Sequence, residues 1–426
     1  MKASSALAPA LRDTARILAR VAAGRSLADE LGPMAGPDME TPRAALIDLT
    51  HGTLRRYGRV QAIVRVLSRQ TRQDALVEAL LWCSLYALES GRYAEYTVVD
   101  QAVRCCALLE KWTAKSYVNA LLRGYLRERG SIEARIGSDP EARYQHPGWW
   151  IDALRAAYPH DWEEALAQGN AHPPMCLRVN RRRARLADCQ AELAAAGMPS
   201  RRVGADGLLL ERPVPVERVP GFAEGRVSVQ DAGAQRAAPC LDLAPGQRVL
   251  DACAAPGGKA AHLLETEDIA LTAVDADATR CAQIARNLDR LGLAATLRVD
   301  DATRLADWWD GVPFDRILAD LPCTASGVAR RHPDLKWLRR ASDVPAFAQR
   351  QAAMLDALWR ALRPGGKLLY VTCSVFPQEN DAVVDAFVAR LGGGAVRLAL
   401  PDGAAAQWLP RAEHDGFFYA LIQRQA

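Results

Sequence analysis

The sequence lacks the patterns that mark several common classes of protein. Its ten cysteines contain no CxxC pair and no zinc-ligand spacing, which speaks against a zinc module and, in 426 residues, against a disulfide framework. It has no run of about 18 uncharged apolar residues, as a membrane span requires. The apolar segment at 3–11 ends at Arg12 and Asp13 and is too short for a secretory signal. We therefore expect reduced thiols, no metal, no membrane partner and a cytoplasmic protein.

Lysine is also scarce. The chain has 6 lysines against 48 arginines, within a modest formal net charge of +4. Arginine makes the better bidentate contacts with phosphate, but a GC-rich genome produces the same bias, so arginine content alone predicts no nucleic-acid partner. Half of the residues are hydrophobic, which is enough for two or three domains with cores of their own.

Three segments with different patterns follow one another. Residues 1–140 have apolar residues at helical spacing and 20 Lys and Arg against 15 Asp and Glu, a net of +5, which predicts a basic all-helical domain. Residues 141–225 indicate a small α+β segment. In 226–426 apolar strands alternate with helices, which predicts a mainly parallel sheet covered on both faces. The final run, 416–425, is expected to be a strand at the edge of that sheet.

Ligands of an open parallel sheet bind beyond the carboxyl ends of its strands. The first strand runs into "DACAAPGGK" (251–259), whose glycines permit close backbone approach and whose following helix offers free N–H groups. The second strand ends at Asp275, a candidate for binding ribose hydroxyls, and the third at Asp300 and Asp301, candidates for an adenine amino group. Since the GxGxxG pattern of dinucleotide sites is absent, the arrangement favours S-adenosylmethionine.

Cysteines follow the next two strands. Cys323 lies in "DLPC" directly after Asp320, and Cys373 follows the apolar run "KLLYVT". A single buried cysteine is more often a small packing residue. Two of them beside a cofactor site indicate covalent chemistry, but the residues alone leave open which thiol attacks.

Several stretches resemble signature motifs of the RNA cytosine-C5 methyltransferases of the Sun/NOL/NOP family. They are "DACAAPGGK" (251–259), "DLPCTASGV" (320–328) and "TCSVFPQEN" (372–380), joined by "VQDAGAQ" (229–235) and "RRHPDLKWLRR" (330–340). The helical segment is similar to NusB RNA-binding domains over 93–129, a pairing similar to the bacterial enzymes that methylate small-subunit (16S) rRNA. One departure, Thr and Ser exchanged in "CTASG", keeps both hydroxyls.

The resemblance implies a fold and a reaction. The fold is a Rossmann-like S-adenosylmethionine-dependent methyltransferase domain with a mainly parallel seven-stranded sheet, preceded by an all-α NusB-like domain and the small α+β segment. In the reaction, Cys373 adds to C6 of a cytosine, which makes C5 nucleophilic, and Cys323 helps to release the product. The Pro-Cys motif of DNA cytosine methyltransferases would favour Cys323 as the nucleophile instead. The base that removes the C5 proton is not identified.

The resemblance also implies residues that bind ligands. Asp320 is expected between the cofactor and the target base. Lys259 is expected to contact a cofactor carboxylate or an RNA phosphate, with a solvated lysine as the alternative. The cofactor residues are expected to be Cys253, Ala254, Ala255, Pro256, Gly257, Gly258, Lys259, Asp275, Asp301 and Asp320.

Two basic runs are candidates for contact with RNA. One is "NRRRAR", and the other is "RRHPDLKWLRR", which adds Trp337 as a stacking residue. Either run is also compatible with a solvated surface. The expected RNA-binding residues are Arg181, Arg182, Arg183, Arg330, Arg331, Lys336, Arg339 and Arg340.

Three other functions stay open at this point. The first is cytosine-C5 methylation of another RNA, such as tRNA, and the second is methylation of a small molecule. The third is a non-enzymatic RNA-binding factor that has kept the fold. The expected partner is 16S rRNA. The sequence leaves open the target cytosine, whether naked rRNA or an assembling subunit is the substrate, and the oligomeric state, for which a monomer is favoured.

Overall fold

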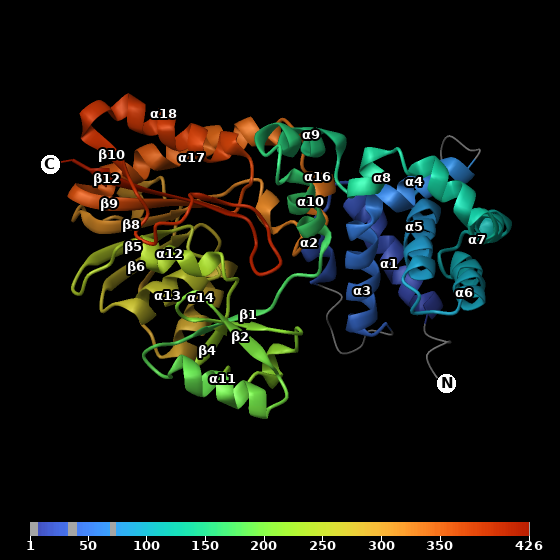
Figure 1. Cartoon of the computed structure of the whole chain (residues 1–426), viewed down its shortest axis with the longest axis horizontal. Helices are drawn as coiled ribbons and strands as arrows, with labels where there is room; N and C mark the ends of the chain where they lie inside the picture. Colours follow the sequence, from blue (N-terminus) through green and yellow to red (C-terminus); the bar gives the residue numbers. More distant parts are fainter. Residues whose placement is uncertain (1–6, 33–40, 69–73, 426) are drawn as a thin grey trace. The chain divides into compact units, whose positions relative to one another are not determined.

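The computed structural model describes residues 7–32, 41–68 and 74–425 (Figure 1). The chain forms two compact units. The helical unit comprises Met1–Ala171 and Ala329–Ala341, and the sheet unit comprises His172–Val328 and Ser342–Ala426. The limits of the two units differ from the three segments predicted from the sequence, 1–140, 141–225 and 226–426. The division into these three segments stays a prediction.

Helices make up the secondary structure that is described in the helical unit. The central helix, α5, is almost continuously buried, and the Asp74 side chain caps it by accepting from the backbone N–H groups of Leu76 and Val77. No helix among the described residues is both long and apolar enough to span a membrane. Residues 7–11 of the apolar segment at 3–11 lie in α1, and residues 3–6 lie outside the described residues. The helices are α1 (Leu7–Ala22), α2 (Leu27–Leu31), α3 (Arg43–Arg55), α4 (Tyr57–Leu67), α5 (Ala75–Glu89), α6 (Glu95–Leu108), α7 (Lys115–Ile136), α8 (Pro140–Tyr144), α9 (Gly148–Ala157), α10 (Trp162–Asn170) and α16 (Leu335–Leu338).

The inserted segment, residues 329–341, is held to the helical unit by specific contacts. The indole Nε1 of Trp337 donates to the Leu54 carbonyl at 3.0 Å, and its ring meets that of Tyr57 edge-on at 5.1 Å between centroids. The Asp334 carboxylate accepts from the backbone N–H of Leu27 at 2.9 Å, at the start of α2. A piece of chain from between β8 (Phe314–Asp320) and α17 (Asp343–Ala361) thus completes the helical core.

The sheet unit begins with a small antiparallel sheet, in the strand order β2-β3-β1-β4. Its apolar residues form a separate small core with those of α11, including Leu177, Leu193 and Leu208. The elements are β1 (Cys176–Val179), α11 (Leu186–Ala195), β2 (Ser200–Val203), β3 (Gly207–Leu210) and β4 (Val227–Val229).

The larger sheet has the strand order β10-β12-β9-β8-β5-β6-β7, with the two-residue β11 beside β12. The strands from β9 to β7 pair in parallel, whereas β12 runs antiparallel to β9 and β10. The Rossmann-like fold with a mainly parallel sheet is confirmed. The strands are β5 (Arg248–Ala252), β6 (Ala270–Asp275), β7 (Thr296–Val299), β8 (Phe314–Asp320), β9 (Leu362–Thr372), β10 (Ala395–Leu398), β11 (Gln407–Trp408) and β12 (Phe417–Arg424).

The expected edge position of the last strand is wrong. β12 is almost entirely buried and lies between β9 and β10. The short, half-exposed β10 takes the edge instead, and its four residues give too weak a strand pattern to be recognised in the sequence.

Helices cover both faces of the larger sheet (Figure 1). Successive strand residues alternate between two cores: Val249 packs with α12, α13 and α14, whereas Leu250 packs with α17 and α18. Because both faces of the sheet are buried, the strands are continuously apolar in the sequence. The helices are α12 (Ala237–Cys240), α13 (Gly258–Thr266), α14 (Ala278–Leu291), α15 (Leu305–Trp308), α17 (Asp343–Ala361) and α18 (Asp381–Leu391).

Candidate active site

The carboxyl ends of five neighbouring parallel strands form one edge of the larger sheet. The loops that leave this edge carry most of the predicted cofactor residues and both predicted catalytic cysteines. The strands β5, β6, β7, β8 and β9 end at Ala252, Asp275, Val299, Asp320 and Thr372. Strand order therefore brings together residues that lie up to about 120 positions apart in the sequence.

The loop after β5 has an unusual backbone, with positive φ angles at two residues. Gly257 has φ +93°, and a Cβ atom there would lie 3.1 Å from the side chain of Ile284. Cys253 also has a positive φ, +60°. The helix α13 then starts at Gly258, so its first N–H groups face the same loop. These features suit a polar ligand with a negative group.

Two of the three predicted cofactor carboxylates, Asp275 and Asp301, differ in their surroundings. Asp275 is buried, and its oxygens accept from the backbone N–H groups of Ala255 at 3.1 Å and Asp277 at 3.2 Å. Asp301 is exposed, and one of its oxygens accepts from the backbone and the hydroxyl of Thr303. These two hydrogen bonds lower the pKa of Asp301. Each carboxylate keeps lone pairs for a ligand.

An ion pair joins two further predicted residues. Lys259 Nζ lies 2.7 Å from Asp320 Oδ2. Burial alone would lower the pKa of Lys259, but the Asp320 carboxylate outweighs burial, and the pKa is raised. Lys259 is therefore a charged partner of Asp320 and not the solvated lysine of the alternative interpretation.

Asp251 is a candidate that was not among the predicted residues. It is the fourth residue of β5, it is fully buried, and neither of its carboxylate oxygens has a hydrogen-bond partner. Burial raises the pKa of this carboxyl group well above its usual range. An unpartnered buried acid beside a cofactor loop suits a cationic ligand group. The signal in the sequence was an acidic residue inside an apolar strand.

The two predicted catalytic thiols lie side by side. Cys323 Sγ and Cys373 Sγ are 3.4 Å apart, although 50 residues separate them in the sequence. Cys323 is buried, at 7% exposure, whereas Cys373 is partly exposed. The hydrogen bond with Cys373, together with burial, raises the pKa of the Cys323 thiol. Of the two, Cys373 is the more accessible to a substrate.

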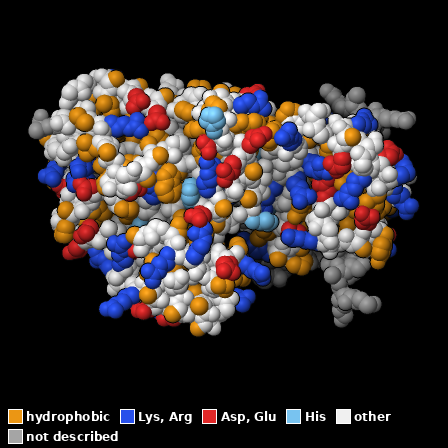
Figure 2. Space-filling model, in the orientation of Figure 1, with side chains coloured by type: hydrophobic (Ala, Val, Ile, Leu, Met, Phe, Trp, Pro, Cys, Tyr) orange, Lys and Arg blue, Asp and Glu red, His pale blue; other side chains and the backbone are white. Residues whose placement is uncertain are grey.

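The first basic run lies at the surface, in the turn between β1 and α11. Arg181 forms an ion pair with Asp206, and Arg183 donates to the Glu224 carbonyl at 2.7 Å. Arg182 and Arg185 are exposed. Figure 2 shows basic side chains interspersed with acidic ones over the face that it draws.

Two residues of the second basic run are corrected. Arg330 and Lys336 were expected to bind RNA, but their side chains are 1% and 0% exposed. Lys336 Nζ donates to the Gln145 carbonyl at 2.9 Å and to Asn170 Oδ1 at 2.6 Å. They face the helical core because the apolar residues around them pack there. Of the other expected residues, Arg331 and Arg339 are partly exposed and Arg340 is exposed.

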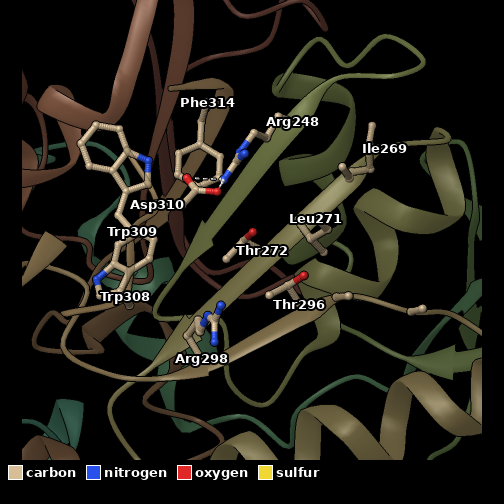
Figure 3. Close-up of a pocket in the computed structure, with 13 residues that line it drawn as sticks. Arg248, Ile269, Leu271, Thr272, Thr296, Arg298, Trp308, Trp309, Asp310 and Phe314 are labelled. Atoms are coloured by element: carbon tan, nitrogen blue, oxygen red, sulfur yellow. Dashed lines mark hydrogen bonds and ion pairs between the residues drawn. The ribbon is translucent and has the colours of Figure 1, made fainter. Parts of the chain in front are cut away.

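A hollow lies at the other end of the strands (Figure 3). Its volume is about 590 Å³, and its lining includes the first residues of β5, β6, β7 and β8. An ion pair of Arg248 with Asp310 and the rings of Trp308 and Trp309 form one side. Since the cysteine loops leave the carboxyl ends, this hollow is no part of the candidate active site.

Comparison with known proteins identifies the family. The model of the "16S rRNA methyltransferase RsmB/F" matches residues 238–423, a ferredoxin-like domain of RsmF/B-like methyltransferases matches 146–217, and the NusB family matches 11–127. The chain is 45% identical to ribosomal RNA small subunit methyltransferase B of Pseudomonas putida, over 96% of this chain and 97% of that protein. The chain belongs to this family. The ribosomal RNA small subunit methyltransferase B of Pseudomonas syringae pv. tomato is 42% identical, over 95% of this chain and 96% of that protein.

A solved structure agrees in fold. A methyltransferase homologue from Pyrococcus horikoshii superposes with a TM-score of 0.59 at 28% identity, over 67% of this chain and 98% of that one. The predicted family membership is thereby confirmed, and the chain is an rRNA methyltransferase.

S-adenosylmethionine is the cofactor of this methyltransferase family, as expected from the sequence. The residues present fit it, since the unpartnered oxygens of Asp251 suit the ammonium group of the methionine moiety. The backbone N–H groups at the start of α13 are donors that suit its carboxylate. Individual contacts with the cofactor stay predictions.

Proposed function

We propose that this RsmB/F protein methylates C5 of a specific cytosine in 16S rRNA through a covalent bond between Cys373 Sγ and cytosine C6. The observation that supports it is the pair of thiols 3.4 Å apart at the ends of β8 and β9, beside the Lys259–Asp320 ion pair. Methyl transfers to more nucleophilic atoms need no thiol adduct. Two neighbouring thiols in a methyltransferase site therefore favour C5 of a pyrimidine.

Cys373 is the proposed nucleophile because it is the more exposed of the two thiols. Its thiolate adds to C6, and the electron pair of the C5–C6 double bond becomes available at C5. S-adenosylmethionine supplies the methyl group that C5 takes. After methyl transfer a base removes the C5 proton, the double bond re-forms and the Cys373 Sγ–C6 bond breaks. The chain's own base for this proton is not assigned.

Cys323 and Asp320 are proposed to assist from either side. The Cys323 thiol lies within hydrogen-bonding distance of Cys373 Sγ and has a raised pKa, so it carries its proton at neutral pH and is placed to protonate the departing thiolate. Asp320 is proposed to contact the cytosine edge or the cofactor. The target base has to leave any stacked helix to reach these groups.

The proposed setting follows from the substrate. RNA of the small ribosomal subunit is the proposed partner, and a protein that acts on it with free thiols is proposed to work in the cytoplasm. The exposed arginines at 181–183 and 340 are proposed to contact its backbone. Flipped bases in RNA are reached at loops more readily than in helices.

Covalent trapping tests the proposal. Purified 16S rRNA and S-adenosylmethionine would be incubated with wild type, Cys373→Ala and Cys323→Ala, followed by denaturing electrophoresis and mapping of 5-methylcytosine. We expect Cys323→Ala to accumulate a protein–RNA adduct and Cys373→Ala to form none. The reverse pattern would assign the attack to Cys323. Methylation of tRNA or of a free metabolite, with none on 16S rRNA, would overturn the substrate.

A further inference from the structure

One buried carboxylate contacts both loops that carry the thiols. Glu379 is 0% exposed. Its Oε1 accepts from the backbone N–H of Thr324 at 2.8 Å, and its Oε2 accepts from the hydroxyls of Thr324 and Ser374, each at 2.6 Å. Thr324 directly follows Cys323, and Ser374 directly follows Cys373. The two hydroxyl groups that donate to Glu379 thus belong to the residues directly after the two cysteines.

Further hydrogen bonds tie the same two loops together. Ser326 Oγ lies 3.1 Å from Ser374 Oγ and accepts from the backbone N–H of Val375 at 2.9 Å. The backbone N–H of Gly327 donates to the Cys373 carbonyl at 2.8 Å. With Glu379 these bonds form a network that spans both loops.

Residues behind the network hold Glu379 itself. The hydroxyl of Tyr370, in β9, donates to the Glu379 carbonyl at 2.5 Å. The amide Nε2 of Gln351, in α17, donates to the Pro322 carbonyl at 2.9 Å and contacts Glu379 Oε1 at 3.3 Å. The strand therefore holds the backbone of Glu379, and the helix contacts its carboxylate.

Stability alone does not account for this carboxylate. Its hydrogen-bond donors are neutral hydroxyl, amide and backbone groups, and burial raises the pKa of Glu379. Burying a carboxylate costs free energy that a well-packed apolar side chain would not. What the carboxylate does provide is several directed hydrogen bonds to two separate loops at once.

We propose that Glu379 is a positioning residue that sets the distance between the Cys323 and Cys373 thiols. The inference rests on the proposed function, in which these two thiols act in turn on one cytosine. Glu379 touches neither thiol in its hydrogen bonds and acts through Thr324 and Ser374. Loss of its contacts would let the loops separate while leaving each thiol chemically intact.

A trivalent aryl arsenical, phenylarsine oxide, measures the thiol separation without RNA or cofactor, because it forms two As–S bonds with closely spaced thiols. To isolate the affinity for the pair of thiols, binding of the arsenical to each protein is compared with binding to the same protein carrying Cys323→Ala, which lacks one thiol of the pair. Since hydrogen bonds to a charged group contribute enough for a tenfold change or more, we expect Glu379→Ala to weaken this affinity by about tenfold. Thr324→Val removes one hydroxyl and should weaken it less, and it serves if Glu379→Ala does not fold.

The matched control is Glu265→Gln. Glu265 is also a buried glutamate of the sheet unit, but it pairs with Arg178, and none of the hydrogen bonds described for it reaches the cysteine loops. It should lose stability, as the midpoint of thermal unfolding reports, and keep the arsenical affinity of the wild type. Equal affinity in wild type, Glu379→Ala and Thr324→Val would overturn the positioning role, as would a wild type that does not bind the arsenical through both thiols.

Methylation assays separate this inference from the proposed function. If Glu379→Ala weakens arsenical binding but the wild type neither methylates nor traps any RNA cytosine, the proposed function fails and the positioning role stands. If the wild type is active, Glu379→Ala should lower kcat with little change in KM for RNA. A change in KM alone, at unchanged arsenical affinity, would contradict the positioning role.

Discussion

The two arginine-rich runs of the chain look alike in sequence and differ in structure. "NRRRAR" forms an exposed turn after β1, with Arg182 and Arg185 at the surface. "RRHPDLKWLRR" belongs to the helical unit, where the side chains of Arg330 and Lys336 are almost completely buried. Charge density therefore says little about exposure. The apolar residues between the charges decide it, because one of them, Trp337, packs against the helical core.

The largest expected effect comes from breaking the buried run at Trp337. Trp337→Ala removes the ring that meets Tyr57 and the indole hydrogen bond to the Leu54 carbonyl. Loss of a packed Trp costs about 3 kcal/mol of unfolding free energy. Urea denaturation measures the change. The control is Trp112→Ala in the same unit, because Trp112 is 62% exposed and should cost far less. Equal losses for the two variants would contradict the packing role of the inserted segment.

The packing of 329–341 in the helical unit also affects how RNA binding by residues 1–140 can be tested. Deleting residues 1–140 would expose the apolar residues of 329–341, which directly follow the Cys323 loop in the chain. A loss of activity after that deletion would therefore not by itself show that the deleted residues bind RNA. Point substitutions on exposed residues separate the two causes.

The second effect is a change in pH dependence at Lys336. Burial lowers the pKa of Lys336 well below its usual range, so in the window below the unfolded value of about 10.4 the unfolded chain binds a proton that the folded chain does not. Unfolding free energy should therefore rise with pH through this window and fall as pH decreases. In Lys336→Met this contribution is absent.

The measurement is the difference in unfolding free energy between wild type and Lys336→Met from pH 7 to pH 10. The difference cancels the titration of other groups, such as tyrosines. As pH rises, the unfolding free energy of the wild type should increase relative to that of Lys336→Met. A constant difference would mean that Lys336 is charged in the folded protein. Lys367→Met is the control, since Lys367 pairs with an exposed aspartate in the sheet unit.

Much of the fold could be predicted because both faces of the large sheet are buried. Continuous apolar strands and their carboxyl-terminal acids and thiols placed Asp275, Asp320, Cys323 and Cys373 at one edge. Local pattern could not place β10, which has only four residues, of which Ala395 is buried and the other three are partly or fully exposed. Nor could it assign 329–341 to the helical unit, because that contact joins residues about 280 positions apart, such as Trp337 and Leu54.

Sequence patterns were also insufficient to identify two residues of the candidate active site. Asp251 and Glu379 stood within recognised motifs, but their significance depends on burial and on hydrogen-bond partners. Asp251 has no partner, and Glu379 has several from two loops. A motif gives the identity of such residues without their environment. The environment arises only when β5, β8 and β9 lie next to one another.

The smallest expected effect is at the exposed run. Arg182→Ala removes a guanidinium group from the surface. The backbone N–H of this residue, and not its side chain, holds the turn by donating to Asn180 Oδ1 at 3.0 Å. Unfolding free energy should change by less than about 0.5 kcal/mol. If Arg182 contacts an RNA phosphate, binding to 16S rRNA weakens a few-fold, and the slope of log affinity against log salt falls by about 0.7 to 0.9.

Filter binding across a salt series, with wild type, Arg182→Ala and Lys336→Met, separates the two runs. Because a phosphate contact releases counterions and a buried lysine does not, only Arg182→Ala should lower the salt slope. If Lys336→Met lowers the slope and Arg182→Ala leaves it unchanged, the buried side chain reaches RNA in solution. The assignment of the two runs would then be reversed, and with it the conclusion that apolar spacing decides which charges face a partner.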